Sequence, residues 1–493
     1  MVVGTASSVG KSVIVTALCR IFRQDGVQVA PFKAQNMSNN ADVTPDGLEI
    51  GRAQSEQAAA AGLAPRVEMN PVLLKPQGDR TSQVVLNGRP AGLLTSAEFD
   101  RRAELWPHVA RALDTLREEY DLVVAEGAGS PAETNLYARD IVNMAVARYA
   151  GAPTILVGDI DRGGVFAHFV GTLALLAPED RPLVRGLVIN RFRGDPALLD
   201  PAIRDVEART GVPVLGVVPW IDDLGIAQED AVALERGDGA ASGPFEVAVI
   251  RFPRIANFDD FDPLAAEPGV RVRYVGRAAD LGHPALVVLP GTKATMADLD
   301  WLRGQGLDIA VRDYVEGGGS VIGICGGMQM LGERLSDPDG VEAEAGRAVE
   351  GLGLLPIATT FVADKTTRRV RGHVAAGRGH WAALRDTLVQ GYEIHMGRTT
   401  PTTSALDPLL SVDGHEDGAV SLDGRVAGTY LHGLFANNAV RRALLRSLGW
   451  REEGAGTPTA ERREAEFDRL ADVVRAHLDL PRIRALLGLE ARG

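Results

Sequence analysis

Short runs of apolar, mostly β-branched residues alternate with helical stretches through the first half of the chain. These runs lie at residues 27–32, 122–125, 154–157, 187–189 and 214–218. Strands that helices cover on both faces are apolar throughout, so this rhythm is typical of a parallel sheet between helices. The pattern predicts an α/β domain over residues 1–232.

A second series of the same kind follows a polar stretch. Residues 233–244 are rich in Gly, Ala and Ser and show no apolar period, so they predict a linker. Apolar runs then return at residues 247–250, 286–289, 321–324 and 429–431. They predict a second α/β domain over residues 245–442.

The last segment, residues 443–493, has a different period. Apolar side chains recur there at helical spacing among Glu and Arg, at Phe467, Leu470, Ala471, Val474 and Leu478. This spacing predicts one amphipathic helix packed on the body of the protein. A chain of 493 residues agrees with two large domains and a tail, because one hydrophobic core rarely serves more than about 300 residues.

Composition and charge exclude several classes of function. Lys and Arg number 52 against 65 Asp and Glu, a net charge of −13, which argues against a general nucleic-acid or anionic-membrane surface. The two cysteines, Cys19 and Cys325, are too few for a disulfide framework. No apolar run approaches the roughly 18 residues of a membrane span. We expect a cytoplasmic protein that acts on small molecules and has no nucleic-acid or membrane partner.

A glycine-flanked loop, GTASSVGKS, opens the first predicted helix at residues 4–12. Backbone N–H groups and the positive end of the helix dipole bind phosphate oxygens at such a loop. We expect Lys11 to neutralise the β and γ oxygens of ATP and the Ser12 hydroxyl to bind Mg²⁺. The nucleotide-binding residues predicted here are Gly4, Thr5, Gly10, Lys11 and Ser12.

Acidic side chains at the ends of later predicted strands are the expected further ligands of Mg²⁺, because this hard cation prefers oxygen ligands. Glu126 directly follows an apolar run and is the first candidate. Asp159 and Asp161 are weaker candidates, since an Asp at a strand end often only caps the next helix.

A cysteine stands at a glycine-rich turn between a β-branched run and a helical stretch, at residues 320–332. This is the layout of a nucleophile elbow, with Cys325 where a hydrolase has serine. The helix N-terminus favours the thiolate, which is the reactive form. Gly326 and Gly291, the latter in a second glycine-bearing loop, are predicted to supply oxyanion-hole N–H groups.

A thiol nucleophile needs a base. His432 follows the last predicted strand of the same domain and is the predicted catalytic base. His395, in a segment that reads GYEIHMG, is the competing candidate and otherwise a residue of the site wall.

Cys325 and His432, in this order, resemble the class I glutamine amidotransferase domain. The usual motif of that family has Glu two residues after the His, and this chain has Leu434 there. The difference points to a subgroup, similar to cobyric acid synthase and cobyrinate diamide synthase, that works with a Cys/His pair. In that subgroup a domain similar to dethiobiotin synthetase precedes the amidotransferase domain, and its phosphate loop also has five residues between the glycines.

Six further segments resemble the cobyric acid synthase family and together span nearly the entire chain. They are residues 31–40, 70–76, 159–166, 190–195, 254–260 and 391–397. The resemblance implies ATP- and Mg²⁺-dependent amidation, with glutamine, of the b, d, e and g carboxylates of adenosylcobyrinic acid a,c-diamide through acyl phosphates. Because two chemistries share one chain, it also implies a protected passage for ammonia between the domains.

Several polar residues in these segments have open roles. Lys33 and Lys75 are predicted to hold the γ-phosphate or the substrate carboxylate, with solvated surface lysines as the alternative. Asn36, Asn39 and Asn40 either bind the amide-rich rim of the corrin or form a loop.

Two other interpretations stay open. One is cobyrinate a,c-diamide synthase, against which the asparagine-rich segment at residues 35–40 argues. The other is a phosphate-loop ATPase switch whose amidotransferase-like half is inert, against which the presence of both Cys325 and His432 argues.

Overall fold

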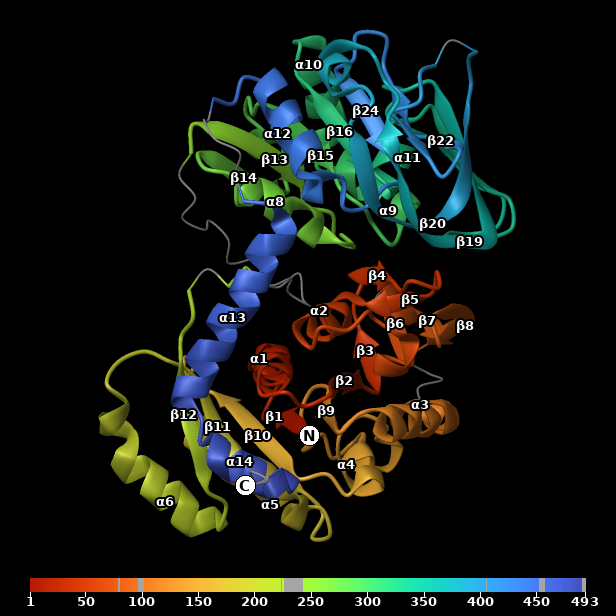
Figure 1. Cartoon of the computed structure of the whole chain (residues 1–493). Helices are drawn as coiled ribbons and strands as arrows, with labels where there is room; N and C mark the ends of the chain where they lie inside the picture. The colour runs from red at the N-terminus through yellow and green to blue at the C-terminus, as the bar shows by residue number, and fades with distance from the viewer. Residues whose placement is uncertain are drawn as a thin grey trace.

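The computed structural model describes residues 1–78, 80–95, 102–222, 224–225, 243–404, 406–451 and 457–489. It consists of two α/β bodies, one above the other in Figure 1, and the first half of the chain forms the lower body. The predicted two-domain α/β class is confirmed. The predicted linker at residues 233–244 lies outside the described residues except for its last two positions.

The lower body is built on a parallel sheet with the strand order β12-β11-β10-β1-β9-β2. Its strands are β1 (Val2–Gly4), β2 (Val29–Lys33), β9 (Leu122–Glu126), β10 (Thr154–Asp159), β11 (Val184–Phe192) and β12 (Val214–Pro219). Its helices are α1 (Lys11–Gln24), α2 (Arg52–Ala60), α3 (Trp106–Glu119), α4 (Met144–Ala150), α5 (Val165–Leu175) and α6 (Asp200–Thr210). Because β1 is central and the strands are parallel, the loop after β1 opens at the edge where its neighbours also end.

Two small β elements lie on the side of the lower body that faces the upper one (Figure 1). One is a sheet of β3 (Gln35–Met37), β6 (Val72–Gly78), β7 (Thr81–Leu86) and β8 (Arg89–Thr95), and the other is the hairpin of β4 (Ala41–Val43) and β5 (Glu49–Gly51). Val43 of the hairpin packs in one apolar cluster with Tyr392 and Ile394 of the upper body. The bodies are therefore in direct contact here.

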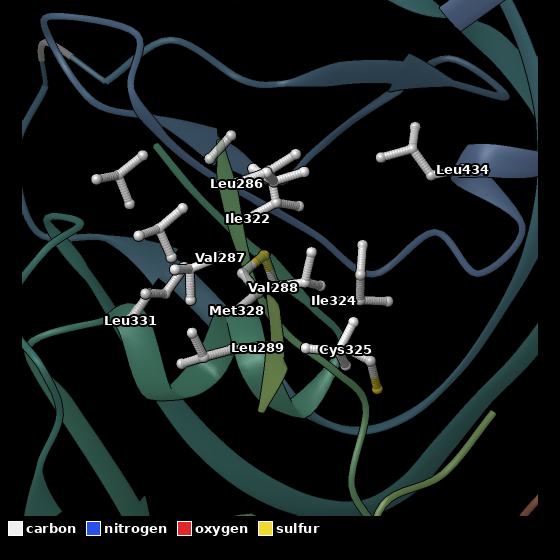
Figure 2. Packing of buried hydrophobic residues seen from close by; sticks show 14 of the residues in the cluster. Leu286, Val287, Val288, Leu289, Ile322, Ile324, Cys325, Met328, Leu331 and Leu434 are labelled. Carbon is white, nitrogen blue, oxygen red and sulfur yellow. The ribbon is translucent and has the colours of Figure 1, made fainter. Parts of the chain in front are cut away.

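The upper body has a sheet with the order β14-β13-β15-β16-β24-β23, parallel except for its last pair. Its strands are β13 (Phe245–Ile250), β14 (Val270–Val275), β15 (Leu286–Leu289), β16 (Val321–Ile324), β23 (Ala419–Val420) and β24 (Val426–Thr429). Its helices are α8 (Asp262–Ala265), α9 (Thr295–Gly304), α10 (Leu307–Glu316), α11 (Gly326–Leu331) and α12 (Asn438–Ser447). Figure 2 shows residues of β15 and β16 packed with Met328 and Leu331 of α11, and Cys325 at the edge of this cluster.

A second, mostly antiparallel sheet completes the upper body. It contains β17 (Arg334–Asp337), β18 (Arg347–Glu350), β19 (Ile357–Val374), β20 (Leu388–Pro401), β21 (Leu410–Val412) and β22 (His415–Asp417). The long strands β19 and β20 pair with each other, and β20 brings His395 beside the cysteine turn.

The tail differs from the single helix that the sequence predicts. It contains α13 (Thr459–His477) and α14 (Leu480–Leu487), separated by an extended Leu478 that bridges Gly216. Pro481 at the start of α14 explains the break, because proline cannot continue a helix that precedes it. The predicted stripe of α13, including Phe467, is buried with residues of α1. No helix in the described part of the chain is long and apolar enough to cross a membrane.

Candidate active site

The phosphate loop lies between β1 and α1, as predicted. Gly10 has a φ of 97°, and a Cβ there would stand 2.1 Å from Asn190 Nδ2, so only glycine fits. Lys11 Nζ donates to the carbonyl oxygens of Ala6 at 3.0 Å and Gly129 at 3.1 Å. These contacts hold the ammonium across the loop mouth while residues 6–8 are exposed to solvent.

Glu126, at the end of β9, is the centre of a buried polar group beside this loop. Its carboxylate accepts from Ser12 Oγ at 2.8 Å and from Gln57 Nε2 at 2.6 Å, and it pairs with Lys33 Nζ at 2.9 Å. Burial alone would raise the pKa of Glu126, but the neighbouring Lys33 ammonium and these donors lower it below its usual range. The structure therefore brings together three predicted residues, Ser12, Lys33 and Glu126, with the carboxylate ionised.

Asp159 does not join that group through its own hydrogen bonds. Its carboxylate accepts from Arg191 Nη1 at 2.8 Å and from the backbone N–H of Asp161 at 2.9 Å. Within the described ranges, no cluster of three or more His, Cys, Asp or Glu side chains has the arrangement of a metal site. Of the predicted Mg²⁺ ligands, Ser12 and Glu126 are thus the two whose side-chain oxygens lie side by side.

Cys325 occupies the turn between β16 and α11 with a φ of 51° and a ψ of −112°. Such backbone strain at a non-glycine residue is typical of a nucleophile elbow. The backbone N–H of Cys325 donates to Thr429 O at 2.8 Å, and its thiol faces Ile394 O at 3.5 Å. These contacts fix the sulfur at the edge of the apolar cluster seen in Figure 2.

His432 is buried next to this thiol and is oriented by an acid that the sequence did not reveal. Its Nδ1 lies 2.7 Å from Asp260 Oδ2, and the other oxygen of Asp260 accepts from the Gly433 N–H at 2.8 Å. Burial alone would lower the pKa of His432, but Asp260 and the hydrogen-bonded Cys325 raise it to about 10. The imidazole is therefore held as a cation in a fixed orientation.

Asp260 lies beside Nδ1 of His432, whereas the chain has Leu434 where the usual motif has Glu. It lies 172 residues before the histidine, in the segment 254–260. The only sequence signal was its place in a segment that resembles the family, so no spacing rule could have found it.

The two predicted oxyanion glycines both lie against the thiol side of this site. A Cβ on Gly291 would be 3.1 Å from His432 Cε1, and one on Gly326 would be 2.8 Å from Thr292 Cγ2. His395 also lines the cavity, but it stacks on Tyr430, and burial lowers its pKa to about 3. His395 is thus a neutral wall residue, while His432 contacts the thiol.

Lys75 is not beside the phosphate loop. Its Nζ lies 2.6 Å from Glu49 Oε1, and the other oxygen of Glu49 pairs with Lys365 of the upper body. Lys75 and Lys365 both line the cavity that contains Cys325 and His432. The predicted role at the γ-phosphate is therefore corrected, because β6 carries Lys75 towards the other site.

Helix α2 and the preceding strand β5 contact both sites. Gln57 donates to Glu126, and Glu49 pairs with two lysines that line the cavity. Arg52 Nε lies 2.9 Å from Asp259 Oδ2, next in sequence to Asp260. Asn40, whose role the sequence left open, accepts from the backbone N–H of Asn257 at 2.7 Å and so joins the two bodies. Asn36 bonds Gln54 inside the lower body.

Fold and site together define a class: a glutamine-hydrolysing carbon–nitrogen ligase with its own nucleotide-binding domain. Family models match both halves, a "CobQ/CobB/MinD/ParA nucleotide binding domain" over residues 1–233 and a "CobB/CobQ-like glutamine amidotransferase domain" over residues 246–440.

Relatives match over the full length. The cobyric acid synthase of Roseiflexus castenholzii is 55% identical over 99% of both chains, and that of Chloroflexus aurantiacus is 55% identical over 97% of this chain and 96% of its own. That of Sorangium cellulosum is 51% identical over 100% of this chain and 99% of its own. The chain belongs to the cobyric acid synthase family.

Proposed function

We propose that this enzyme uses ATP and glutamine to amidate the b, d, e and g carboxylates of adenosylcobyrinic acid a,c-diamide, in cobalamin biosynthesis. The observation that carries the proposal is the presence of two complete, chemically different sites in one chain: the Ser12–Glu126 phosphate loop and the Cys325–His432–Asp260 group. Full-length similarity to proteins named cobyric acid synthase supports this choice of acceptor.

In the upper body, the Cys325 sulfur attacks the side-chain amide carbon of glutamine. The N–H groups of Gly291 and Gly326 stabilise the oxyanion, and imidazolium His432 gives its proton to the departing ammonia. Water then cleaves the thioester, which releases glutamate and restores the thiol. Asp260 keeps the imidazole aimed at the sulfur throughout.

In the lower body, Lys11, with Gly4, Thr5 and Gly10 of the loop, binds the ATP phosphates. The Ser12 hydroxyl and the Glu126 carboxylate fit Mg²⁺, because both offer hard oxygens 2.8 Å apart beside the loop. Mg²⁺ neutralises the phosphate charge when bound. Lys33, which also contacts Glu126, is placed to hold the carboxylate that receives the γ-phosphoryl group.

Ammonia then displaces phosphate from the acyl phosphate, so each cycle converts one carboxylate, one glutamine, one ATP and one water into an amide, glutamate, ADP and phosphate. Side chains of both bodies line the Cys325 cavity, with Lys75 and Gln77 from the lower one. This shared lining supports the proposal that ammonia released there passes to the lower body without crossing bulk water, which would protonate it.

Mass spectrometry of the corrinoid after incubation with ATP, Mg²⁺ and glutamine tests the acceptor. Four successive replacements of OH by NH₂ are expected on adenosylcobyrinic acid a,c-diamide. Glutamine hydrolysis without any change on this corrinoid would contradict the proposal, and amidation of cobyrinic acid at the a and c positions instead would favour the diamide synthase.

A further inference from the structure

Lysine is rare in this chain and is confined to its two sites. Only five lysines occur among the 52 basic residues, and arginine supplies the rest. Lys11 and Lys33 contact the phosphate-loop group, and Lys75, Lys293 and Lys365 line the Cys325 cavity. Because arginine serves every other position that needs positive charge, each lysine marks a place where a compact ammonium has a specific use.

Of the three cavity lysines, Lys293 is the one without a counterion. Lys75 and Lys365 share the two oxygens of Glu49. The structure records no ion pair within 4.0 Å and no side-chain hydrogen bond for Lys293 among the residues it describes. Lys293 follows the oxyanion glycine Gly291 by two positions, and its backbone N–H is fixed on Arg254 O at 3.0 Å. Lys293 therefore follows directly on the oxyanion loop and lines the cavity that contains Cys325.

Glu342 is an acidic residue that lines the same cavity as Lys293. One oxygen accepts from the Met296 N–H at 2.7 Å and so caps helix α9. No basic side chain lies within 4.0 Å of it in the described part of the chain, although Lys293 is close enough to act on it electrostatically. The cavity thus presents one basic and one acidic side chain, each without an ion pair within 4.0 Å among the described residues.

A ligand with charges opposite to those of Lys293 and Glu342 would stabilise the ionised form of both side chains. Burial, followed by the charges of Lys365 and Lys75, lowers the pKa of Lys293 to about 7. Burial also raises the pKa of Glu342 to about 7, against the hydrogen bonds from α9. A ligand that brings a carboxylate to Lys293 and an ammonium to Glu342 would restore the charged form of each group.

We propose that Lys293 binds the α-carboxylate and Glu342 the α-ammonium of glutamine, so that these two residues select the amino acid whose amide Cys325 attacks. The assignment rests on the proposed glutaminase function. Glutamine is a zwitterion at the end remote from its amide, and Lys293 and Glu342 line the same cavity as Cys325. Glu49 already pairs with both Lys75 and Lys365, so we do not assign these three residues to glutamine binding.

Two substrate analogues test each charge separately in the full-length enzyme. 4-Aminobutanamide lacks the α-carboxylate, and glutaramate lacks the α-amino group. In Lys293→Met, the preference in kcat/KM for L-glutamine over 4-aminobutanamide should fall roughly 10- to 100-fold, as expected for loss of a charge-assisted contact. The preference of the same variant for L-glutamine over glutaramate should stay unchanged.

Glu342→Gln should show the reverse pattern, because its amide oxygen can still cap α9 but cannot pair with an ammonium. Lys293→Arg, which keeps the charge, should recover part of the preference that Lys293→Met loses. Each preference is a ratio within one variant and does not depend on how much of that variant is folded.

An unchanged preference in both charge-removing variants would overturn the assignment while leaving the glutaminase function intact. Absence of glutamine hydrolysis by the unmodified enzyme would overturn the proposed function itself and the assignment with it. The two failures are therefore distinguishable.

Discussion

At the scale of single residues, both sites depend on ionised side chains whose charge is maintained by a buried partner. Asp260 keeps His432 protonated, and Lys33 keeps Glu126 ionised. Cys325 and His432 could be predicted because each stands directly after an apolar run that ends at the same sheet edge. Asp260 could not, because its contact with His432 depends on how a loop folds back across the domain.

Replacing Asp260 by Asn should reduce glutamine-dependent turnover by roughly 100-fold or more, chiefly in kcat. The Asn amide can accept from only one of the two N–H groups that Asp260 serves, and His432 loses the negative charge that raises its pKa. The alkaline limb of the kcat–pH profile, expected near the His432 pKa of about 10, should therefore move to lower pH. If kcat fell but the alkaline limb of the kcat–pH profile stayed at the same pH, the proposed action of Asp260 on His432 would be contradicted.

At the scale of elements, most strands of the two parallel sheets were predictable, but the edge strand β14 and the rest of the β structure were not. Strand β15 lies where the apolar run at residues 286–289 predicts it, because strands buried on both faces are uniformly apolar. Strands β6 and β19 mix apolar residues with Lys, Arg and Thr, so no simple period reveals them. These two strands carry Lys75 and Lys365, which explains why the composite cavity was not predicted.

Helix α2 joins the two bodies through Arg52. Its guanidinium pairs with Asp259 at 2.9 Å, Glu56 at 3.2 Å and Asp42 at 3.4 Å, all of which are buried. Breaking a buried pair is costly, about 3–5 kcal/mol, because the remaining charges lose their partner. Arg52→Met should therefore lower the thermal unfolding midpoint by several degrees at pH 8.

The decrease in the unfolding midpoint caused by Arg52→Met should become smaller towards pH 5. Burial raises the pKa of Asp259 to about 6 even with Arg52 present, and removal of Arg52 raises it further. A carboxyl group whose pKa is higher in the folded than in the unfolded state stabilises the folded protein at low pH. This stabilisation is lost as the pH rises through the pKa of the folded state. Arg209→Met is the control, since its pair with Asp205 is exposed and should contribute little. An equal loss at both pH values would contradict the electrostatic explanation.

At the scale of the whole molecule, the lower body completes the cavity of the upper one. Lys75 and Gln77 line it, and the β5–α2 unit contacts both sites, while α13 runs beside both bodies in Figure 1. The Cys325 cavity therefore takes part of its lining from the synthetase domain. Two domains that worked independently would not require lower-body residues in the lining of the upper-body cavity.

The most direct test of this account uses Cys325→Ala with two nitrogen sources. With glutamine, ATP, Mg²⁺ and the a,c-diamide, this variant should form no amide. With ammonium chloride at alkaline pH in place of glutamine, it should still complete the four amidations at a rate near that of the unmodified enzyme. Glutamine-driven amidation that survives the loss of the thiol would contradict the central claim that Cys325 supplies the ammonia used in the lower body.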